Sequence, residues 1–344
     1  MKEMSPTKAL VVQYSLAAQR GRERDWIRAA GLPRSTYQQA RKQVYEDGWI
    51  EDRFVPNPSA LAITSVTFAV MKPYTERLAD ISRAWEDLPT SVCLWTGRES
   101  VMGVFFGSPS DEELRLHSAL KSSPSSAGTW VVSVDPQAAS VPAYFDFEGV
   151  WASFCGLGGT LTYPQPLLGK RLIGRKQGAG PLTVRAKGRL GGLVARPFVK
   201  GGSGFRTHPY FLPRSERRMI SEGWVSHRSF IDLRNLPPCG GRRLEGVAWL
   251  HGTLIPGQRA PDVFRALVER CHVKPFLFAS NADQALLGTL SQKPPPDSTI
   301  FPSRAPVLET LEAYLSNIET IREPIESVIV GVNHRYERLF SSTT

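Results

Sequence analysis

Polar side chains between residues 34 and 43 recur at a spacing that lets them make hydrogen bonds to the edges of DNA bases. Tyr37, Ala40 and Val44 are spaced i, i+3 and i+7, so one helical face is apolar and the other is polar. Glutamine reads adenine edges, and arginine or lysine reads guanine or phosphate. We therefore predict that a helix over Arg34–Val44 contacts DNA. Its outward residues are Arg34, Ser35, Thr36, Gln38, Gln39, Lys42 and Gln43.

The flanking residues predict the elements that position this helix. Residues 6–19 and 22–30 are helical by pattern, and Gly31 separates the second of them from Arg34 with a tight turn. Gly48 ends the polar helix in a left-handed conformation. Two short strands of a wing are then expected at Trp49-Ile50 and at Arg53-Phe54-Val55, which adds Arg53 to the DNA-contacting set. Residues 1–58 are thus predicted to be a winged helix-turn-helix domain.

The net charge of +10 is concentrated in one region of the chain. Residues 151–245 carry 17 basic and four acidic residues, and no acidic residue occurs between Glu148 and Glu216. A polyanion is the simplest partner for such a region, and nucleic acid is the commonest polyanion in a cytosol. The alternative is a solvated, flexible linker. The residues predicted to contact DNA here are Lys170, Arg171, Arg175, Lys176, Arg185, Lys187, Arg189, Arg214, Arg217 and Arg218.

Two further segments predict modules with the ferredoxin-like order β-α-β-β-α-β. In the first (residues 59–150), strands are expected at Leu61–Met71, Thr90–Trp95, Val101–Phe106 and Thr129–Val134, and helices at Tyr74–Leu88 and from Ser110 onward. In the second (residues 244–344), strands are expected at 246–255, Lys274–Phe278, Ala285–Leu290 and Ser327–Val332, and helices at Pro261–Cys271 and Pro306–Ile321. The fold class is therefore α+β with an internal duplication.

A duplication predicts a second winged helix within residues 151–243. Ser215–Ile231 does echo the first, because Gly223-Trp224 corresponds to Gly48-Trp49 after a basic helix. Upstream, residues 156–206 hold thirteen glycines, a density that disfavours helix interiors. We therefore expect this second winged helix to be degenerate.

The segment Gly31–Ile50 resembles the Lrp/AsnC family of transcription regulators, and the αβ module that follows is similar to that family's effector domain. The resemblance implies a DNA-binding transcription regulator with double-stranded DNA as partner. It also implies pairing of αβ modules, here as an internal pseudo-dimer or a homodimer. Pro33 and Ala40 depart from the family, which usually has a serine and an arginine at these positions.

The same resemblance implies a small-molecule effector near a Gly-x-x-Asp turn between two strands. In the first module this turn is Gly97 to Ser100, which keeps the glycine and loses the acid. In the second it is Ser280 to Asp283, which keeps the acid and loses the glycine. Gly97, Ser100 and Asp283 are therefore candidate effector-binding residues, and the alternative is that both turns are ordinary hairpins.

The pair of modules also resembles the siroheme decarboxylases, which use His and Tyr on the second strand of a module. Here those strands are Ser91–Thr96 and Val273–Ala279, and neither carries such a set. Four scattered cysteines and six dispersed histidines predict no cofactor, metal site or catalytic residue. We therefore predict a cytoplasmic protein that is not an enzyme and does not associate with a membrane. An architectural nucleoid protein, or an enzyme or sensor built on the paired modules, is the alternative.

Overall fold

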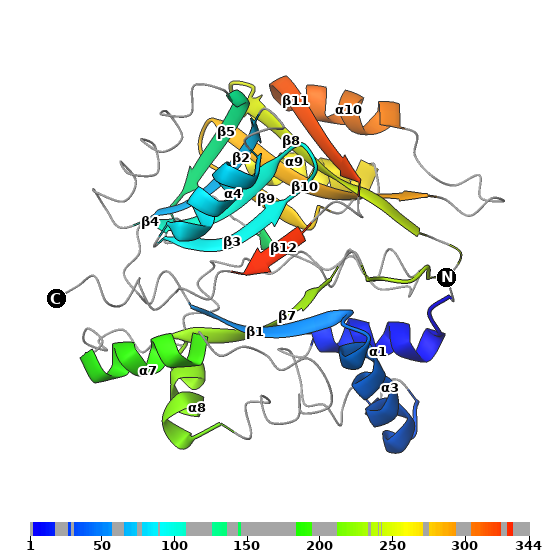
Figure 1. Ribbon diagram of the computed structural model, residues 1–344. Helices are drawn as coiled ribbons and strands as arrows, with labels where there is room; N and C mark the ends of the chain where they lie inside the picture. Colours follow the sequence, from blue (N-terminus) through cyan, green and yellow to red (C-terminus); the bar gives the residue numbers. More distant parts are fainter. Residues whose placement is uncertain are drawn as a thin grey trace.

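The structure is a computed structural model of the 344-residue chain. It describes residues 3–17, 27–28, 31–56, 65–73, 78–88, 90–107, 126–135, 144–145, 184–194, 212–232, 235–239, 241, 243–270, 275–293, 304–324 and 329–332. The fold is mixed α+β, as predicted, with two five-stranded sheets and one two-stranded sheet. In Figure 1 the large sheets lie above the two-stranded sheet, and further helices lie below it.

The N-terminal helices form where the apolar spacing predicts them. Helix α1 covers Pro6–Ala17, and helix α3 covers Arg34–Glu46. Tyr37, Ala40 and Val44 of α3 are buried, and α3 packs against α1. Gly48 follows α3 with a φ of 70°, the left-handed conformation expected of a glycine after a helix. The helix predicted at residues 22–30 lies largely outside the described residues.

The two-stranded sheet joins segments that are far apart in the sequence. Strand β1 (Ile50–Pro56) pairs antiparallel with β7 (Val225–Ile231), with Ile50 opposite Ile231. The sequence predicted two short wing strands at residues 49–55, whereas the structure has one continuous strand there. The distant β7 supplies the hydrogen-bond partners that a second wing strand would have supplied.

Helices α7 (Val184–Val194) and α8 (Arg214–Ser221) lie at the end of this sheet opposite to α1 and α3 (Figure 1). Helix α7 packs against β1 and α8 against β7, while α1 also packs against β7. Each strand is therefore held by helices from both halves of the chain. Helix α7 forms although it contains Gly188, Gly191 and Gly192. The expectation that the many glycines of residues 156–206 exclude a helix is therefore wrong for this segment. Its Leu190 and Leu193 are buried, and tertiary packing overrides weak helix propensity.

The first large sheet has the order β12-β3-β4-β2-β5, with helix α4 (Leu78–Asp87) on its outer face. Its strands are β2 (Ser65–Pro73), β3 (Ser91–Thr96), β4 (Val101–Gly107), β5 (Ser126–Val134) and β12 (Ile329–Val332). Strand β2 is buried on both faces: Phe68 and Val70 face the other sheet, while Ala69 and Met71 pack with Trp85 of α4. The helix predicted from Ser110 onward lies outside the described residues.

The second large sheet has the order β11-β8-β10-β9-β6. Its strands are β8 (Arg243–Leu254), β9 (Leu277–Ser280), β10 (Gln284–Lys293), β11 (Leu315–Pro324) and β6 (Tyr144–Phe145), and helices α9 (Ala260–Arg270) and α10 (Arg304–Glu312) accompany them. The order β8-α9-β9-β10-α10-β11 follows the predicted order of elements up to α10.

The helix expected over Pro306–Ile321 is wrong in its second half, which is strand β11. Leu315, Ile318 and Ile321 recur every three residues, which resembles a helical period. A bulge causes this spacing, because the four residues of β11 from Ser316 to Glu319 oppose only three residues of β8, His251 to Thr253. Asn317 lies inside the bulge with a φ of 52°.

Each large sheet takes one edge strand from the other half of the chain. Strand β12, at the C-terminal end, pairs with β3 of the first sheet, and β6 pairs with β9 of the second. The strand predicted at Ser327–Val332 therefore exists over Ile329–Val332 but belongs to the first sheet rather than the second. This exchange leaves neither half of the chain with a complete sheet of its own.

The two sheets share one apolar core at the seam between them. Trp95 of β3 packs against Trp249 of β8 and Phe276, with ring centroids 5.9 Å and 6.2 Å apart. The cluster is continuous with the buried residues of the helices below, among them Val44 and Leu190. Two smaller clusters lie on the outer faces, one around Phe264 and Phe278 and one around Trp85 and Phe105.

Candidate functional site

Helix α3 presents most of its predicted DNA-contacting side chains to solvent. Arg34, Ser35, Thr36, Gln39 and Lys42 are exposed, whereas Gln38 is half-buried. Lys42 forms an i,i+4 ion pair with Glu46 at 3.6 Å, and both side chains are well exposed. Such a surface pair contributes little to stability, so Lys42 can exchange it for a phosphate or a base at low cost.

Helix α8 repeats the start of α3, a signal that the sequence comparison missed. Leu-Pro-Arg-Ser opens both helices, at residues 32–35 and 212–215. Pro33 and Pro213 precede their helices with φ and ψ of −58° and 140° and of −51° and 149°. Helix α3 has 13 residues and α8 has eight. An ungapped alignment that matches Gly48-Trp49 to Gly223-Trp224 therefore does not place the two Leu-Pro-Arg-Ser segments opposite each other.

The ends of the two helices have the same hydrogen-bond pattern. The Gly48 and Gly223 amides donate to the carbonyls of Tyr45 and Ile220, each at 3.1 Å. The Trp49 amide donates to Val44 O at 3.1 Å, and the Trp224 amide to Met219 O at 3.0 Å. Both indoles are buried. The two halves of the chain thus hold their polar helices by the same local geometry, on opposite ends of the β1–β7 sheet (Figure 1).

The exposed basic side chains of α8 are Arg214, Arg217 and Arg218. Arg218 forms an ion pair with Glu222. Hydrogen bonds from Arg218 and Trp224 lower the pKa of Glu222, while its partial burial raises it. Arg189 is exposed on the adjacent α7, and Arg185 and Lys187 lie on the same helix. Arg53 lies on β1. The predicted residues Lys170, Arg171, Arg175 and Lys176 lie outside the described residues.

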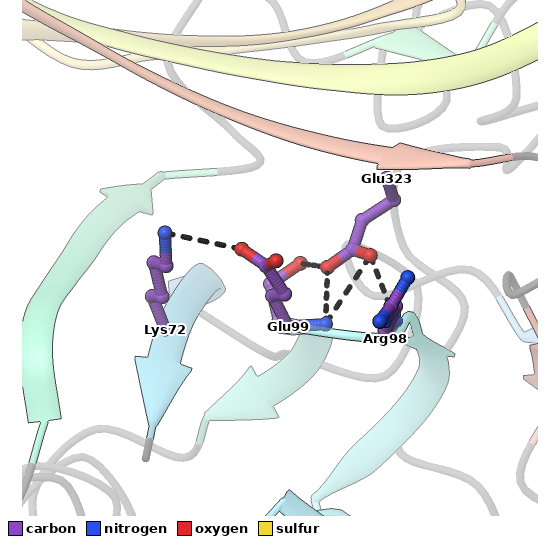
Figure 2. A network of polar contacts seen from close by, with 5 residues as sticks. Lys72, Arg98, Glu99 and Glu323 are labelled. Carbon is purple, nitrogen blue, oxygen red and sulfur yellow. Dashed lines mark hydrogen bonds and ion pairs between the residues drawn. The ribbon is translucent and has the colours of Figure 1, made fainter. Parts of the chain in front are cut away.

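The turn that contains Gly97 and Ser100 holds a carboxylate from the other sheet (Figure 2). Glu323 of β11 is 2% exposed and accepts hydrogen bonds from the amides of Arg98 and Glu99 at 2.7 Å and 2.9 Å. The hydroxyl of Ser100 donates to the same carboxylate at 2.6 Å. Gly97 and Ser100 thus lie together, as candidate effector residues should, but the turn offers donors rather than the carboxylate that would attract an amino group.

The corresponding turn of the second module is closed by its own side chain. Asn281 Oδ1 accepts hydrogen bonds from the amides of Asp283 and Gln284 at 2.9 Å and 2.8 Å. Asp283 itself is exposed. Four residues separate Thr96 from Val101, and four separate Ser280 from Ala285, so the two turns are equivalent in register. Asp283 lies in the β9–β10 turn of the second sheet, whereas Gly97 and Ser100 lie in the β3–β4 turn of the first.

A third polar group lies at the rim of the seam between the sheets. The ring of His251 on β8 stacks on Trp130 of β5, with centroids 5.5 Å apart and planes 11° apart. The indole of Trp130 donates to the carboxylate of Glu319 on β11. Nε2 of His251 is buried without a hydrogen-bond partner in the described part of the chain. Burial lowers the pKa of His251, while Glu319 and a hydrogen bond with Gln284 raise it. The arrangement places an imidazole whose pKa is lowered by burial next to a carboxylate, a pair of groups that can accept or relay a proton.

No group of three or more His, Cys, Asp or Glu side chains within the described residues could hold a metal ion. Among the same residues, no helix is both long and apolar enough to cross a membrane.

The comparisons with known proteins give similarity of structure only. No family model matches the sequence, and no curated protein does either. The chain is similar to siroheme decarboxylase NirDL, alone and with an iron-uroporphyrin III analogue: the identity is 11%, the TM-score 0.48, and 97% of this chain and 96% of that chain are covered. It is also similar to a transcriptional regulatory protein of the AsnC family from Pyrococcus furiosus, with 13% identity and a TM-score of 0.30, over 38% of this chain and 89% of that chain.

These matches correct one prediction. The sequence predicts a protein that is not an enzyme, whereas the solved structures that the chain matches along 97% of its length are those of an enzyme. An AsnC-family regulator is among the similar structures, over a smaller share of the chain than the decarboxylase, and no family model confirms the resemblance to Lrp/AsnC proteins.

Proposed function

We propose that this chain binds double-stranded DNA through α3 and α8, as the two unequal halves of one binding surface. The observation that carries this proposal is the repeated geometry: two helices with the same opening and the same closure lie at opposite ends of the β1–β7 sheet and expose basic and amide side chains. This arrangement resembles a pair of winged helices, each followed by an αβ module of ferredoxin-like order. Neither helix has a side-chain cap at its N-terminus, which favours phosphate there.

The two helices have different chemistry, and this predicts different roles. Gln39 and Lys42 lie on the exposed face of the longer α3, where they can reach base edges in the major groove. The shorter α8 exposes Arg214, Arg217 and Arg218, which suit phosphate contacts. The proposal is therefore sequence selection by α3 and non-selective attraction by α8, with the basic region of residues 151–245 adding to the attraction.

Binding to random and to selected duplexes at several salt concentrations tests this proposal. Replacing Gln39 and Lys42 by Ala should reduce the preference for a selected duplex by about 10-fold or more, because a good contact to a base edge contributes about 1–3 kcal/mol of discrimination. Replacing Arg217 and Arg218 by Ala should weaken binding to all duplexes alike. It should also reduce the slope of log K against log salt by about 2, one for each lost phosphate contact.

The matched control replaces Arg83 and Arg259, two exposed arginines on the outer parts of the αβ modules, by Ala. This variant loses the same charge as the Arg217/Arg218 variant and should bind DNA like the wild type. Equal effects of the two pairs would refute the role of α8, and no binding at low salt would refute DNA binding. Strong binding without any sequence preference would instead support an architectural protein.

The group at His251 favours a second candidate, an enzyme or sensor whose ligand binds at the seam of the modules. His251 and Glu319 supply a proton acceptor and a carboxylate next to the flat face of Trp130. Trp95, Trp249 and Phe276 fill the centre of the seam, so a ligand would have to bind at its rim.

An iron uroporphyrin is a suitable probe for this second candidate, since the similar decarboxylase structure contains such an analogue. Titration should shift the Soret absorption of the probe in the wild type, and His251→Ala should weaken the binding at least several-fold. An unchanged spectrum would argue against this ligand class.

A further inference from the structure

The turn at residues 97–100 has the form of an anion site, and it is filled. The amides of Arg98 and Glu99 point to one side of the turn (Figure 2). The hydroxyl of Ser100 donates to the carboxylate that these amides bind. Successive amides that converge in this way form a nest that binds anionic oxygens. The oxygens that they bind are those of Glu323, which reaches the turn from β11 of the other sheet.

Gly97 gives the carboxylate the space that it occupies. A Cβ atom at Gly97 would lie 2.3 Å from Cδ and 2.6 Å from Oε1 of Glu323. The φ of Gly97 lies outside the left-handed region, so the turn itself does not require glycine. The absence of a side chain at Gly97 therefore leaves room for the carboxylate of Glu323.

The rest of the duplicated structure shows that this contact is particular to one turn. The equivalent turn in the second module satisfies its amides with its own Asn281. The position on β5 that corresponds to Glu323 is Val134, because Val134 pairs with Val66 of β2 as Glu323 pairs with Val247 of β8. Only one of the two equivalent places in the described structure thus combines an open turn with a carboxylate.

We propose that the 97–100 turn is a carboxylate-binding site whose resident ligand is the side chain of Glu323. The ligand class that the site accepts is a small, unbranched carboxylate, since the hydrogen-bond donors to the anion among the described residues are neutral and Gly97 leaves room for little more. Glu323 thereby joins β11 of the second sheet to the β3–β4 turn of the first. A free carboxylate effector can enter only by displacing Glu323, which separates the two sheets at this point.

The test removes the resident ligand and supplies a free one. Glu323→Ala deletes an acetate-sized group, so acetate should bind in the vacated space and restore stability. Thermal unfolding of this variant is followed in sodium acetate and in sodium chloride of equal ionic strength. Acetate at about 0.2 M should raise its melting temperature by about 3 °C more than it raises that of the wild type, because a ligand that binds only the folded state stabilises it by mass action.

Three controls separate specific binding from a general salt effect. Glu319→Ala removes a carboxylate from the same strand without opening the turn, and it should respond to acetate like the wild type. Pivalate is too bulky for the site and should not rescue Glu323→Ala. Gly97→Ala combined with Glu323→Ala places a methyl group where the carboxylate would sit, and it should abolish the rescue.

Acetate rescue that is confined to Glu323→Ala supports the proposal. An equal effect of acetate on Glu323→Ala and Glu319→Ala, or rescue that survives the added Gly97→Ala change, overturns it. If Glu323→Ala does not fold in chloride, the yield of folded protein on refolding in acetate replaces the melting temperature as the readout. Failure of acetate to raise that yield overturns the proposal as well.

Discussion

At the scale of single residues, His251 is a titratable side chain on which burial and charge act in opposite directions. Burial against Trp130 lowers its pKa from the usual 6.5, and the nearby carboxylate of Glu319 raises it. Burial is the larger influence, so the folded protein binds this proton less readily than the unfolded chain. The contribution of His251 to stability is therefore complete above pH 6.5 and is lost as the pH falls toward its pKa in the folded state.

We expect the wild type to lose more stability between pH 7.5 and pH 5.5 than His251→Gln does. Urea unfolding followed by tryptophan fluorescence at both pH values measures this difference. Glu319→Gln provides a matched variant with the histidine in place, and its loss should exceed that of the wild type because the carboxylate no longer favours the protonated ring. Equal losses in the wild type and His251→Gln would show that His251 is not displaced from its ordinary pKa.

Residues of the candidate sites were predictable only where their partners lie close in the sequence. Gly97 and Ser100 belong to one four-residue turn, so the resemblance to an effector turn pointed to both as candidates. Glu323 lies 225 residues from Arg98, and no local pattern links such positions. Its strand was also hidden by the bulge at Asn317, which makes the apolar residues of β11 recur as they do in a helix.

At the scale of secondary-structure elements, α7 is a helix whose packing outweighs its sequence. Leu190 and Leu193 are buried in the main core, while Gly188 and Gly192 face solvent. Glycine in a helix interior costs about 0.5–1 kcal/mol relative to alanine. The buried leucines therefore stabilise a helix that the glycines alone would disfavour, so glycine density by itself is a poor predictor in this segment.

Replacing either glycine by alanine should stabilise the protein. A Cβ atom at Gly188 or Gly192 would meet no atom within 4 Å, so the substitutions restrict the unfolded chain without steric cost. We expect each of them to raise the free energy of unfolding by about 0.5–1 kcal/mol, measured by urea denaturation. Gly103→Ala is the contrasting variant, since its Cβ would lie 2.5 Å from the ring of Phe105, and it should destabilise. A loss of stability in the α7 variants would mean that α7 is not helical in solution.

Elements with strong periodicity were predicted well, and those made by distant pairing were not. Helix α3 and strand β4 follow their expected spans because apolar spacing and glycines mark their ends. The sequence predicted two strands in place of the single strand β1, since its partner β7 lies about 175 residues further along the chain. The opening of α8 was missed because this helix has eight residues where α3 has 13.

At the scale of the whole molecule, the two halves of the chain are interlocked by exchanged strands. The first half receives β12 and the second half receives β6, while β1 and β7 form a sheet to which each half gives one strand. A shared core of buried side chains continues from the helices into the seam of both sheets. Such a structure should unfold as one cooperative unit rather than as two domains.

A divided chain tests this interlocking. Residues 1–150 lack the partners β12 and β7, and residues 151–344 lack β6 and β1, so each fragment exposes unpaired strand edges and apolar core surface. We expect each fragment to aggregate when expressed alone, and the two to co-purify in a 1:1 ratio with the near-UV circular dichroism of the intact chain when expressed together. Moving the cut to follow Asp135 returns β6 to the second fragment, which should make that fragment more soluble. A fragment 151–344 that folds alone as a stable monomer would show that the second half does not depend on the strands it borrows.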